Sequence, residues 1–263
     1  MLVDTLLYLL LGAFAGLLAG LLGVGGGLVI VPILAAIFIY NGMPYEVIMH
    51  LALGTSLASI LFTSISSVYS HHKHQAVSWS NVYKLSPGVL LGAWLGAVFA
   101  SMLSTDILKP VFAIFELLVA AYLLWGVNAK AHKSTPTLLN FTISGGIIGY
   151  ISSIVGIGGG TMTVPWLMWH GSSIHKAIAT SAAIGFPIAA AGAASYFYAG
   201  WGHDLLPQYS LGFIYLPALI SIIISSVVFA PLGAKLAHRL DVKKLKQIFA
   251  FLLISLATYL LLS

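Results

Sequence analysis

Two short glycine-rich segments carry the clearest chemical signal in the chain. Gly-Val-Gly-Gly-Gly at 23–27 and Gly-Ile-Gly-Gly-Gly at 156–160 are each followed, at the same spacing, by Val-Pro, with prolines at Pro32 and Pro165. The spacing differs from the dinucleotide fingerprint G-x-G-x-x-G, and no Gly-Lys-Ser/Thr of a phosphate-binding loop is present. A glycine run costs conformational entropy and leaves backbone amides uncovered. These two segments are therefore the first candidates for a binding site.

A helix is predicted to begin directly after each glycine run. The first N–H groups of a helix have no partner within it and carry a positive partial charge, so two such helix starts facing each other would bind an anion without a buried cation. We expect the following glycines to contact the substrate: Gly25, Gly26, Gly27, Gly158, Gly159 and Gly160. We expect Pro32 and Pro165 to act as hinges. The alternative is that the glycines only allow close helix packing.

Hydroxyl side chains follow each glycine segment at matching positions. Thr55-Ser56 and Thr180-Ser181 fall in the next apolar stretch of each half, and Thr161 comes directly after the second glycine run, where the first half has Leu28. Such hydroxyls either donate to an oxyanion or bond to a carbonyl one turn earlier in their own helix. We expect all five to contribute to substrate binding, in a site that is not fully symmetric.

One carboxylate lies well inside an apolar stretch. Glu116 stands in Phe-Ala-Ile-Phe-Glu-Leu-Leu-Val, where an ionisable group is costly and by default a functional hypothesis. His50 and His170 lie near the ends of apolar stretches and could titrate near neutral pH. These three are candidates for proton coupling, and a purely structural role is the alternative for each.

Composition places the chain in a membrane. Hydrophobic residues make up 60% and charged residues 6% of the 263 residues, and mean hydropathy is +1.03. A soluble protein needs about 25% charged residues to solvate its surface. Soluble enzymes, nucleic-acid-binding proteins and disordered proteins are thereby excluded, and the chain is predicted to be an integral membrane protein.

Enzymatic and metal chemistry find no support in the sequence. There is no cysteine, which excludes disulfides and thiolate sites. Neither the G-x-S-G of a serine protease nor the H-E-x-x-H of a zinc enzyme occurs, and the aspartates fall at the ends of apolar stretches or in loops. The tract His71-His72-Lys73-His74 is better explained as a solvated loop than as a metal site. We therefore predict no catalytic residue, no metal and no cofactor.

Apolar stretches without strand-like alternation predict an all-α polytopic fold. They fall roughly at 2–22, 28–40, 46–70, 85–103, 107–127, 137–155, 161–170, 174–200, 210–234 and 245–262. Two of them, 28–40 and 161–170, are short for a full crossing. We expect eight to ten membrane helical elements: six full spans and two broken or hairpin elements at the glycine motifs, with ten crossing helices as the alternative.

The landmarks recur in the same order in the two halves of the chain. The glycine-Val-Pro segments are followed by Thr-Ser, then by Pro87 and Pro217, then by Tyr122 and Tyr259. We predict two repeats, 1–128 and 129–263, forming one transport domain. Because each contains five apolar stretches, an odd number, the second repeat should be inverted relative to the first.

Numbering the connections alternately separates the charges. One side then holds Lys73, Lys84, Lys130, Lys133, Lys176, Lys235, Arg239, Lys243, Lys244 and Lys246. The other holds Lys109 together with Asp4, Glu46, Asp106 and Asp204. The positive-inside rule makes the lysine-rich side cytoplasmic, with both termini outside. Cations scattered over separate short loops suit lipid head groups and not nucleic acid.

With its paired G-x-G-G-G…V-P motifs, each followed by A-x-x-T-S, the chain resembles the TauE/SafE family of sulfite and organosulfur anion exporters over essentially its whole length. The family positions that match are Gly23, Gly25, Gly26, Gly27, Pro32, Thr55 and Ser56, with Gly156, Gly158, Gly159, Gly160, Pro165, Thr180 and Ser181. The resemblance implies a secondary transporter that exports a small anion (sulfite, an organosulfonate such as sulfoacetate, or a related carboxylate) across the cytoplasmic membrane of a bacterium or archaeon. Ion-gradient coupling is our added hypothesis. An anion channel or a non-transporting scaffold is the alternative. The expected partners are the anion and membrane lipids, and a homo-oligomer is left open.

Overall fold

The computed structural model describes residues 2–23, 25–126, 136–236 and 242–262, with backbone alone for residue 22 and for 242–246. These residues form helices joined by short loops, and the described part contains no strand beyond one isolated bridge, between Ser210 and Tyr215. The helices are α1 (Leu2–Leu22), α2 (Gly27–Tyr40), α3 (Tyr45–Lys73), α4 (Trp79–Ser101), α5 (Thr105–Trp125), α6 (Leu138–Ile154), α7 (Gly160–Trp169), α8 (Ile174–Ala199), α9 (Leu216–Leu236) and α10 (Val242–Leu262). The predicted all-α class is confirmed.

Six of the described helices are long and apolar enough to cross a membrane, namely α1, α3, α4, α5, α8 and α9. The most buried of them are α3 and α8, whose apolar windows are 83% and 78% buried, whereas α9 is only 33% buried. The two central helices therefore face protein on nearly all sides, and the outer helices present Leu, Ile and Phe side chains outward. This is the arrangement expected of a multi-pass membrane protein.

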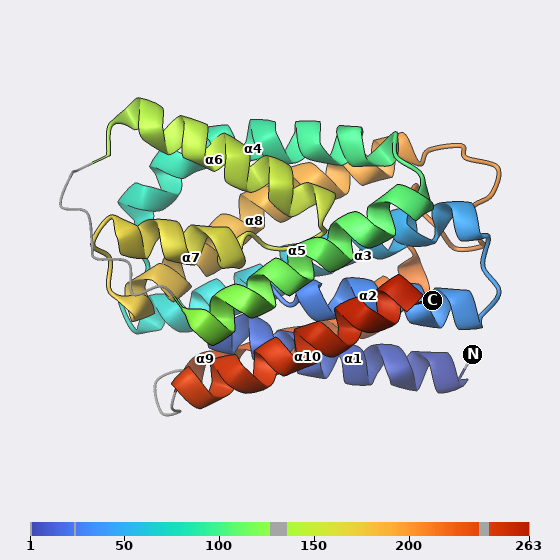
Figure 1. The fold of residues 1–263 in the computed structure, drawn as a ribbon, viewed down its shortest axis with the longest axis horizontal. Helices are drawn as coiled ribbons and strands as arrows, with labels where there is room; N and C mark the ends of the chain where they lie inside the picture. The colour runs from blue at the N-terminus through green and yellow to red at the C-terminus, as the bar shows by residue number, and fades with distance from the viewer. Residues whose placement is uncertain (1, 24, 127–135, 237–241, 263) are drawn as a thin grey trace.

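Each glycine segment forms the turn of a helical hairpin. Helix α1 runs inward from the end of the molecule that carries the N-terminus, and α2 returns towards that same end (Figure 1). Helices α6 and α7 do the same from the opposite end (Figure 1). With 14 and 10 residues, α2 and α7 span about 21 and 15 Å, too short for a hydrocarbon core of about 30 Å. Of the two arrangements predicted for the glycine segments, the hairpin is the one observed.

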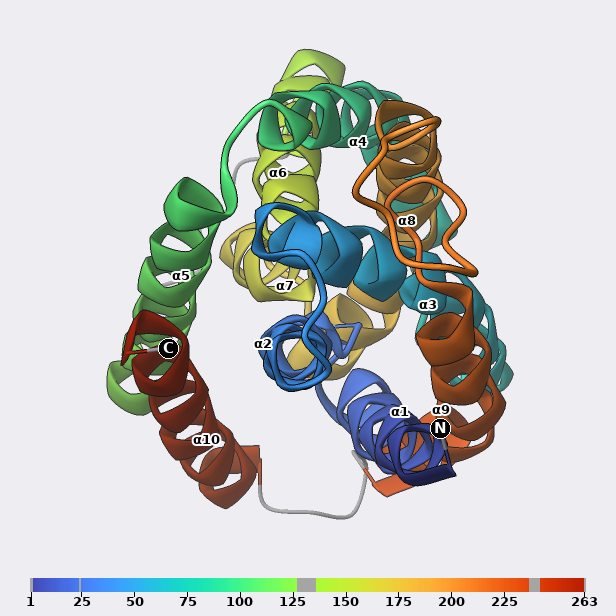
Figure 2. The same cartoon turned by 90° about the vertical axis from the view of Figure 1, so that its right-hand side faces the viewer.

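Helix pairs recur between the two halves of the chain. Helix α1 packs along α9 and α6 along α4, α3 crosses α8 at the centre, and α5 pairs with α10 at one edge (Figure 2). Exchanging α1–α5 for α6–α10 reproduces every one of these pairs. The predicted boundary at 128 lies outside the described residues, so the division into two repeats stays a prediction that this pairing supports.

One of the landmarks used to align the halves is placed differently by the structure. Pro87 lies well inside α4, whereas Pro217 is the second residue of α9. The two prolines therefore do not occupy equivalent positions. The other landmarks, Tyr122 and Tyr259, lie near the ends of the paired helices α5 and α10.

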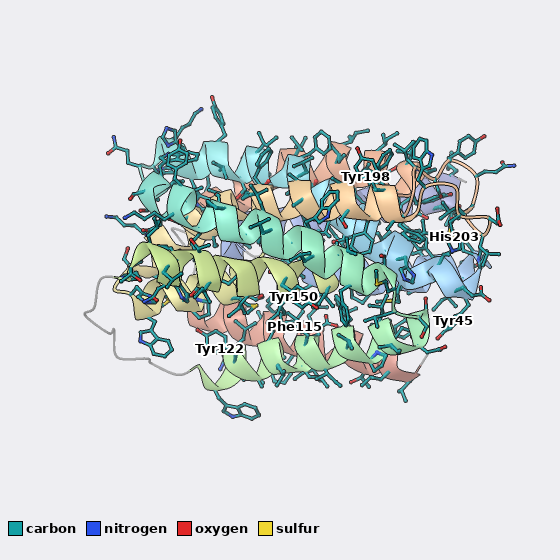
Figure 3. All side chains as sticks on the ribbon, turned by 90° about the horizontal axis from the view of Figure 1, so that it is seen from above. Tyr45, Phe115, Tyr122, Tyr150, Tyr198 and His203 are labelled. Atoms are coloured by element: carbon teal, nitrogen blue, oxygen red, sulfur yellow. The ribbon has the colours of Figure 1, made fainter. Side chains whose placement is uncertain are left out.

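The described charges separate between the two ends of the molecule. We call the end at which α3 finishes and α8 begins the lysine end, because Lys73, Lys84, Lys176 and Lys235 lie in the helix turns there. The opposite end carries both termini (Figure 1), and we call it the terminal end. Tyr45 and His203 lie at the terminal end (Figure 3). The hydroxyl of Tyr45 donates to Asp106 Oδ1 at 3.0 Å. Of the other cations in the prediction, Lys130, Lys133 and Arg239 lie outside the described residues, as do the side chains of Lys243, Lys244 and Lys246.

Candidate functional site

The two glycine turns meet at the centre of the molecule. A Cβ atom placed on Gly25 would lie 3.0 Å from the Cα of Gly158. A Cβ on Gly27 would collide with the carbonyl of Gly156. Any side chain at these positions would therefore push the hairpins apart. The predicted juxtaposition of the two helix starts is present.

Each short helix begins at a glycine in the left-handed conformation. Gly26 caps α2 with φ 76°, and Gly159 caps α7 with φ 74°, a region that L-residues with a side chain rarely adopt. Neither cap has a side-chain hydrogen bond. The amides of Gly26 and Gly27, like those of Gly159 and Gly160, donate to no other described residue. These unpaired donors lie where the sequence predicted an anion to bind, and that role stays a prediction.

A small cavity of about 10 Å³ borders both turns. It is lined by Ala19, Gly23, Gly25, Ile60, Ser64, Ser67, Gly158, Ala182 and Gly185. That volume holds about one water molecule, far less than a sulfonate needs. The lining contains no charged side chain, and its polar side chains are Ser64 and Ser67. Of the residues predicted to bind the substrate, Gly25 and Gly158 line this cavity and the others do not. In this conformation the centre of the molecule is occluded.

The predicted Thr-Ser pairs link the two halves at this centre. Ser56 donates to the carbonyl of Gly156 at 2.8 Å. Its counterpart Ser181 lies 3.2 Å from the carbonyl of Gly23 and also bonds to Ile178 in its own helix, at 2.8 Å. These hydroxyls therefore hold the opposite glycine turn in place.

The two threonines make a second matching pair of bonds. Thr55 Oγ1 accepts from the amide of Tyr215 at 2.9 Å, and Thr180 Oγ1 accepts from the amide of Ser78 at 3.0 Å. Tyr215 directly precedes α9, and Ser78 directly precedes α4. Each hydroxyl has its own proton left to donate. The role of these threonines in substrate binding stays a prediction. Their structural role is observed: each hydroxyl holds the segment that precedes a helix of the opposite half.

Thr161 lies in the first turn of α7 beside the second glycine run. Its hydroxyl and that of Thr163 are buried and have no hydrogen-bond partner among the described residues. In the first half, Leu28 and Ile30 follow the glycines instead. The asymmetry expected from the sequence is therefore present in the side chains at the two helix starts.

The three coupling candidates are not brought together. Glu116 is fully buried in α5, and neither of its carboxylate oxygens has a partner among the residues described. His50 stacks on Phe213 at the terminal end, with ring centroids 4.9 Å apart. His170 lies at the lysine end, where its Nδ1 is 2.8 Å from the carbonyl of Trp166. None of the three lines the central cavity.

Two serines of the cavity lining were missed by sequence reasoning. Ser64 and Ser67 follow Ser56 along the same helix, and the hydroxyl of Ser67 is buried without a partner in the described part of the chain. Polar residues recur along one buried side of α3, at Ser56, Ser59, Thr63, Ser67 and Ser70. That period of three to four residues, inside an otherwise apolar stretch, is a helical signal that could have identified Ser67.

Comparison with known proteins shows the family of the chain. The family model described as sulfite exporter TauE/SafE matches residues 8–260. This chain belongs to the TauE/SafE family. A "Probable membrane transporter protein" of Haemophilus influenzae is 40% identical over 98% of both chains. Another of Methanocaldococcus jannaschii is 28% identical over 97% of this chain and 95% of its own. No solved structure matches significantly.

Membership of the TauE/SafE family makes the chain a membrane transporter and not an enzyme, as its sequence predicted. The names of these relatives give no substrate, whereas the family description names sulfite.

Proposed function

We propose that this TauE/SafE protein is a secondary transporter that exports a small anion through a site between its two glycine hairpins. The observation that carries the proposal is the close approach of Gly25 to Gly158, two residues of the cavity lining that directly precede the helix caps Gly26 and Gly159. Helix starts of this kind favour negative charge. No lysine or arginine lines the cavity, so the backbone itself supplies the attraction.

The substrate class follows from the size and donors of the site. Amides and hydroxyls suit a compact oxyanion such as sulfite, a short organosulfonate such as sulfoacetate, or a short carboxylate. The absence of a lysine or arginine from the cavity lining argues against a large polyphosphate. The family description supports sulfite in particular.

Transport requires the occluded centre to open alternately to each side. Two hairpins entering from opposite ends, with recurring helix pairs, suit an inverted pair of repeats that rock around a fixed central site. The positive-inside rule makes the lysine end cytoplasmic. Export then runs from the lysine end to the terminal end of the molecule.

The test is flux of sulfite and of sulfoacetate in proteoliposomes. Gly26→Leu and Gly159→Leu should each abolish flux, because the side chain blocks the amides and forces the left-handed backbone to change. Gly42→Leu is the matched control: Gly42 has φ 67°, but a Cβ placed there would meet no atom within 4 Å, so its variant carries the strain without the obstruction. Wild-type flux in both hairpin variants would reduce the glycines to packing residues. Flux far above carrier rates would favour the channel alternative.

Proton coupling is assigned to Glu116. Burying a carboxyl group without a hydrogen-bond partner costs free energy whether the group is protonated or ionised. Glu116 is therefore the group best placed to carry a proton across the occluded protein. Glu116→Gln should keep substrate exchange while removing the response of flux to an imposed pH gradient. An unchanged response in the variant would exclude Glu116 as the coupling group, and wild-type flux that ignores the gradient would remove proton coupling altogether.

A further inference from the structure

Two loop segments occupy equivalent places at the two ends of the molecule. The amide of Phe213 donates to the carbonyl of Tyr196 at 3.2 Å, and the amide of Ala76 donates to the carbonyl of His71 at 3.3 Å. Two residues further on, Tyr215 and Ser78 make the matching bonds to the threonines of the opposite half described above. Segments 213–215 and 76–78 therefore have the same backbone role, one before α9 and one before α4.

At the terminal end this place is filled by large side chains. The segment reads Phe-Ile-Tyr, and Phe213 is 3% exposed. Its ring lies 4.9 Å from that of His50 in α3 and 5.5 Å from that of His203 in the preceding loop. Tyr215 packs edge-on against Phe38 of α2, with centroids 5.5 Å apart. The place before α9 is therefore filled by aromatic rings at this end.

At the lysine end the same place is hollow. The segment reads Ala-Val-Ser, and in place of aromatic rings there is a cavity of about 500 Å³, which we call the lysine-end cavity. It is lined by Gln75, Ala76, Val77, Ser78, His170, Gly171, Ser172, Ser173 and Lys176. The backbone of Ser78, which forms part of this lining, is bonded to Thr180. The cavity thus ends one hydrogen bond away from a Thr-Ser pair of the central site.

The lining of this cavity suits an anion. Lys176 supplies a positive charge, Ser78, Ser172 and Ser173 supply hydroxyls, and no aspartate or glutamate is among the lining residues. Lys176 precedes Thr180 by one helical turn, so both side chains lie on the same side of α8. A cavity lined by one sign of charge concentrates ions of the opposite sign.

We propose that the lysine-end cavity is an entry site that binds the small anion before it reaches the glycine turns, and that the aromatic segment 213–215 closes the equivalent place at the terminal end. The inference rests on the proposed function for the identity of its ligand as the transported anion. Its geometry does not depend on that function. The size of the side chain at positions 76 and 213 then decides from which end of the molecule the anion can reach the glycine turns.

The charge of the entry site is tested by thiol modification, for which the cysteine-free chain is a suitable background. Ser172→Cys is treated with anionic 2-sulfonatoethyl methanethiosulfonate or with the uncharged methyl reagent; each forms a disulfide and releases methanesulfinate. Adding Lys176→Gln should slow the anionic reagent about threefold to fivefold and leave the uncharged one unchanged. Equal effects on both reagents, or none, would overturn the anion site.

The two closures are tested by exchanging bulk. Ala76→Phe should slow modification of Ser172→Cys by both reagents at least about tenfold, whereas Ala76→Ser should leave the rate unchanged. In the opposite direction, Phe213→Ala should expose an otherwise unreactive His50→Cys, with Phe213→Leu as a milder variant should the first not fold. An Ala76→Phe protein that reacts at the original rate, or a His50→Cys that reacts equally with Phe213 in place, contradicts the assignment.

These outcomes are separable from those of the proposed function. Reactivity of Ser172→Cys is measured without transport, so a protein that moves none of the tested anions but keeps the dependence on Lys176 would lose the transport proposal and retain the entry site. Normal sulfite flux in Lys176→Gln and Ala76→Phe would contradict the entry site and leave the transport proposal in place.

Discussion

At the scale of single residues, the centre is held by polar contacts between the halves. Ser56 spans from α3 to the carbonyl of Gly156, and both residues are buried. Ser181 shares its proton between Gly23 and the nearer carbonyl of Ile178. The two matching serines should therefore contribute unequally to stability, because only one of them has the opposite turn as its main acceptor.

Ser56→Ala should lower the free energy of unfolding by about 1 kcal/mol or more, since it leaves the buried carbonyl of Gly156 without its donor. Ser181→Ala should cost less. Ser255→Ala, which removes an exposed bond within α10, is the control and should be neutral. Thermal unfolding in detergent measures all three, and equal midpoints for Ser56→Ala and Ser255→Ala would contradict the predicted role.

At the scale of elements, glycines set the distance between paired helices. A Cβ on Gly149 of α6 would collide with the carbonyl of Val89 in α4, whereas the nearest atom to a Cβ on the neighbouring Gly146 is 3.8 Å away. The same closeness recurs between Gly16 of α1 and Ser226 of α9. Small residues in membrane helices allow two backbones to approach closely. The van der Waals packing gained there stabilises the helix pair in lipid, where no hydrophobic effect drives helices together.

Gly149→Ala should therefore destabilise the α4–α6 pair by about 1–3 kcal/mol through overpacking. Gly146→Ala should be neutral or stabilise by up to about 1 kcal/mol, because alanine is the better helix former and its methyl group has room. The comparison is made by thermal unfolding of the purified protein. A similar loss in both variants would show that helix propensity, and not the close approach, dominates at these positions.

At the scale of the whole molecule, the two ends differ in charge and in bulk. Of the five lysines whose side chains are described, four lie at the lysine end, whereas Lys109 lies with Asp106, Glu46 and the aromatic segment 213–215 at the terminal end. Two halves related by an inverted repeat would by themselves make the two ends of the molecule alike. The differences in charge and side-chain size therefore distinguish one end of the molecule from the other. The same lysines fix its orientation in the bilayer.

Single cysteines at the two ends should report that orientation. Tyr40→Cys, at the exposed end of α2, should react with a membrane-impermeant maleimide added to intact cells, and Trp125→Cys, at the exposed end of α5, should react only after the membrane is opened. The reverse pattern would invert the direction of transport proposed here.

Much of the fold and part of the site could be predicted from local pattern. Apolar stretches near 20 residues predict helices because lipid leaves no other partner for the backbone, and the two glycine runs marked the helix starts at Gly27 and Gly160. The Thr-Ser pairs were found as well, but not their acceptors. Ser67 was missed although it belongs to the period of polar residues along α3, because only the tertiary structure shows the cavity beside it.

The sequence by itself determined the membrane class, the helices, the paired glycine motifs and the separation of charge, since each depends on composition or on neighbours along the chain. Only the tertiary structure decided that the glycine segments are hairpins, that Pro87 and Pro217 are not equivalent, and that Ala76 and Phe213 are. Those facts depend on which backbone groups meet across more than a hundred residues of chain, where no local periodicity constrains the pairing.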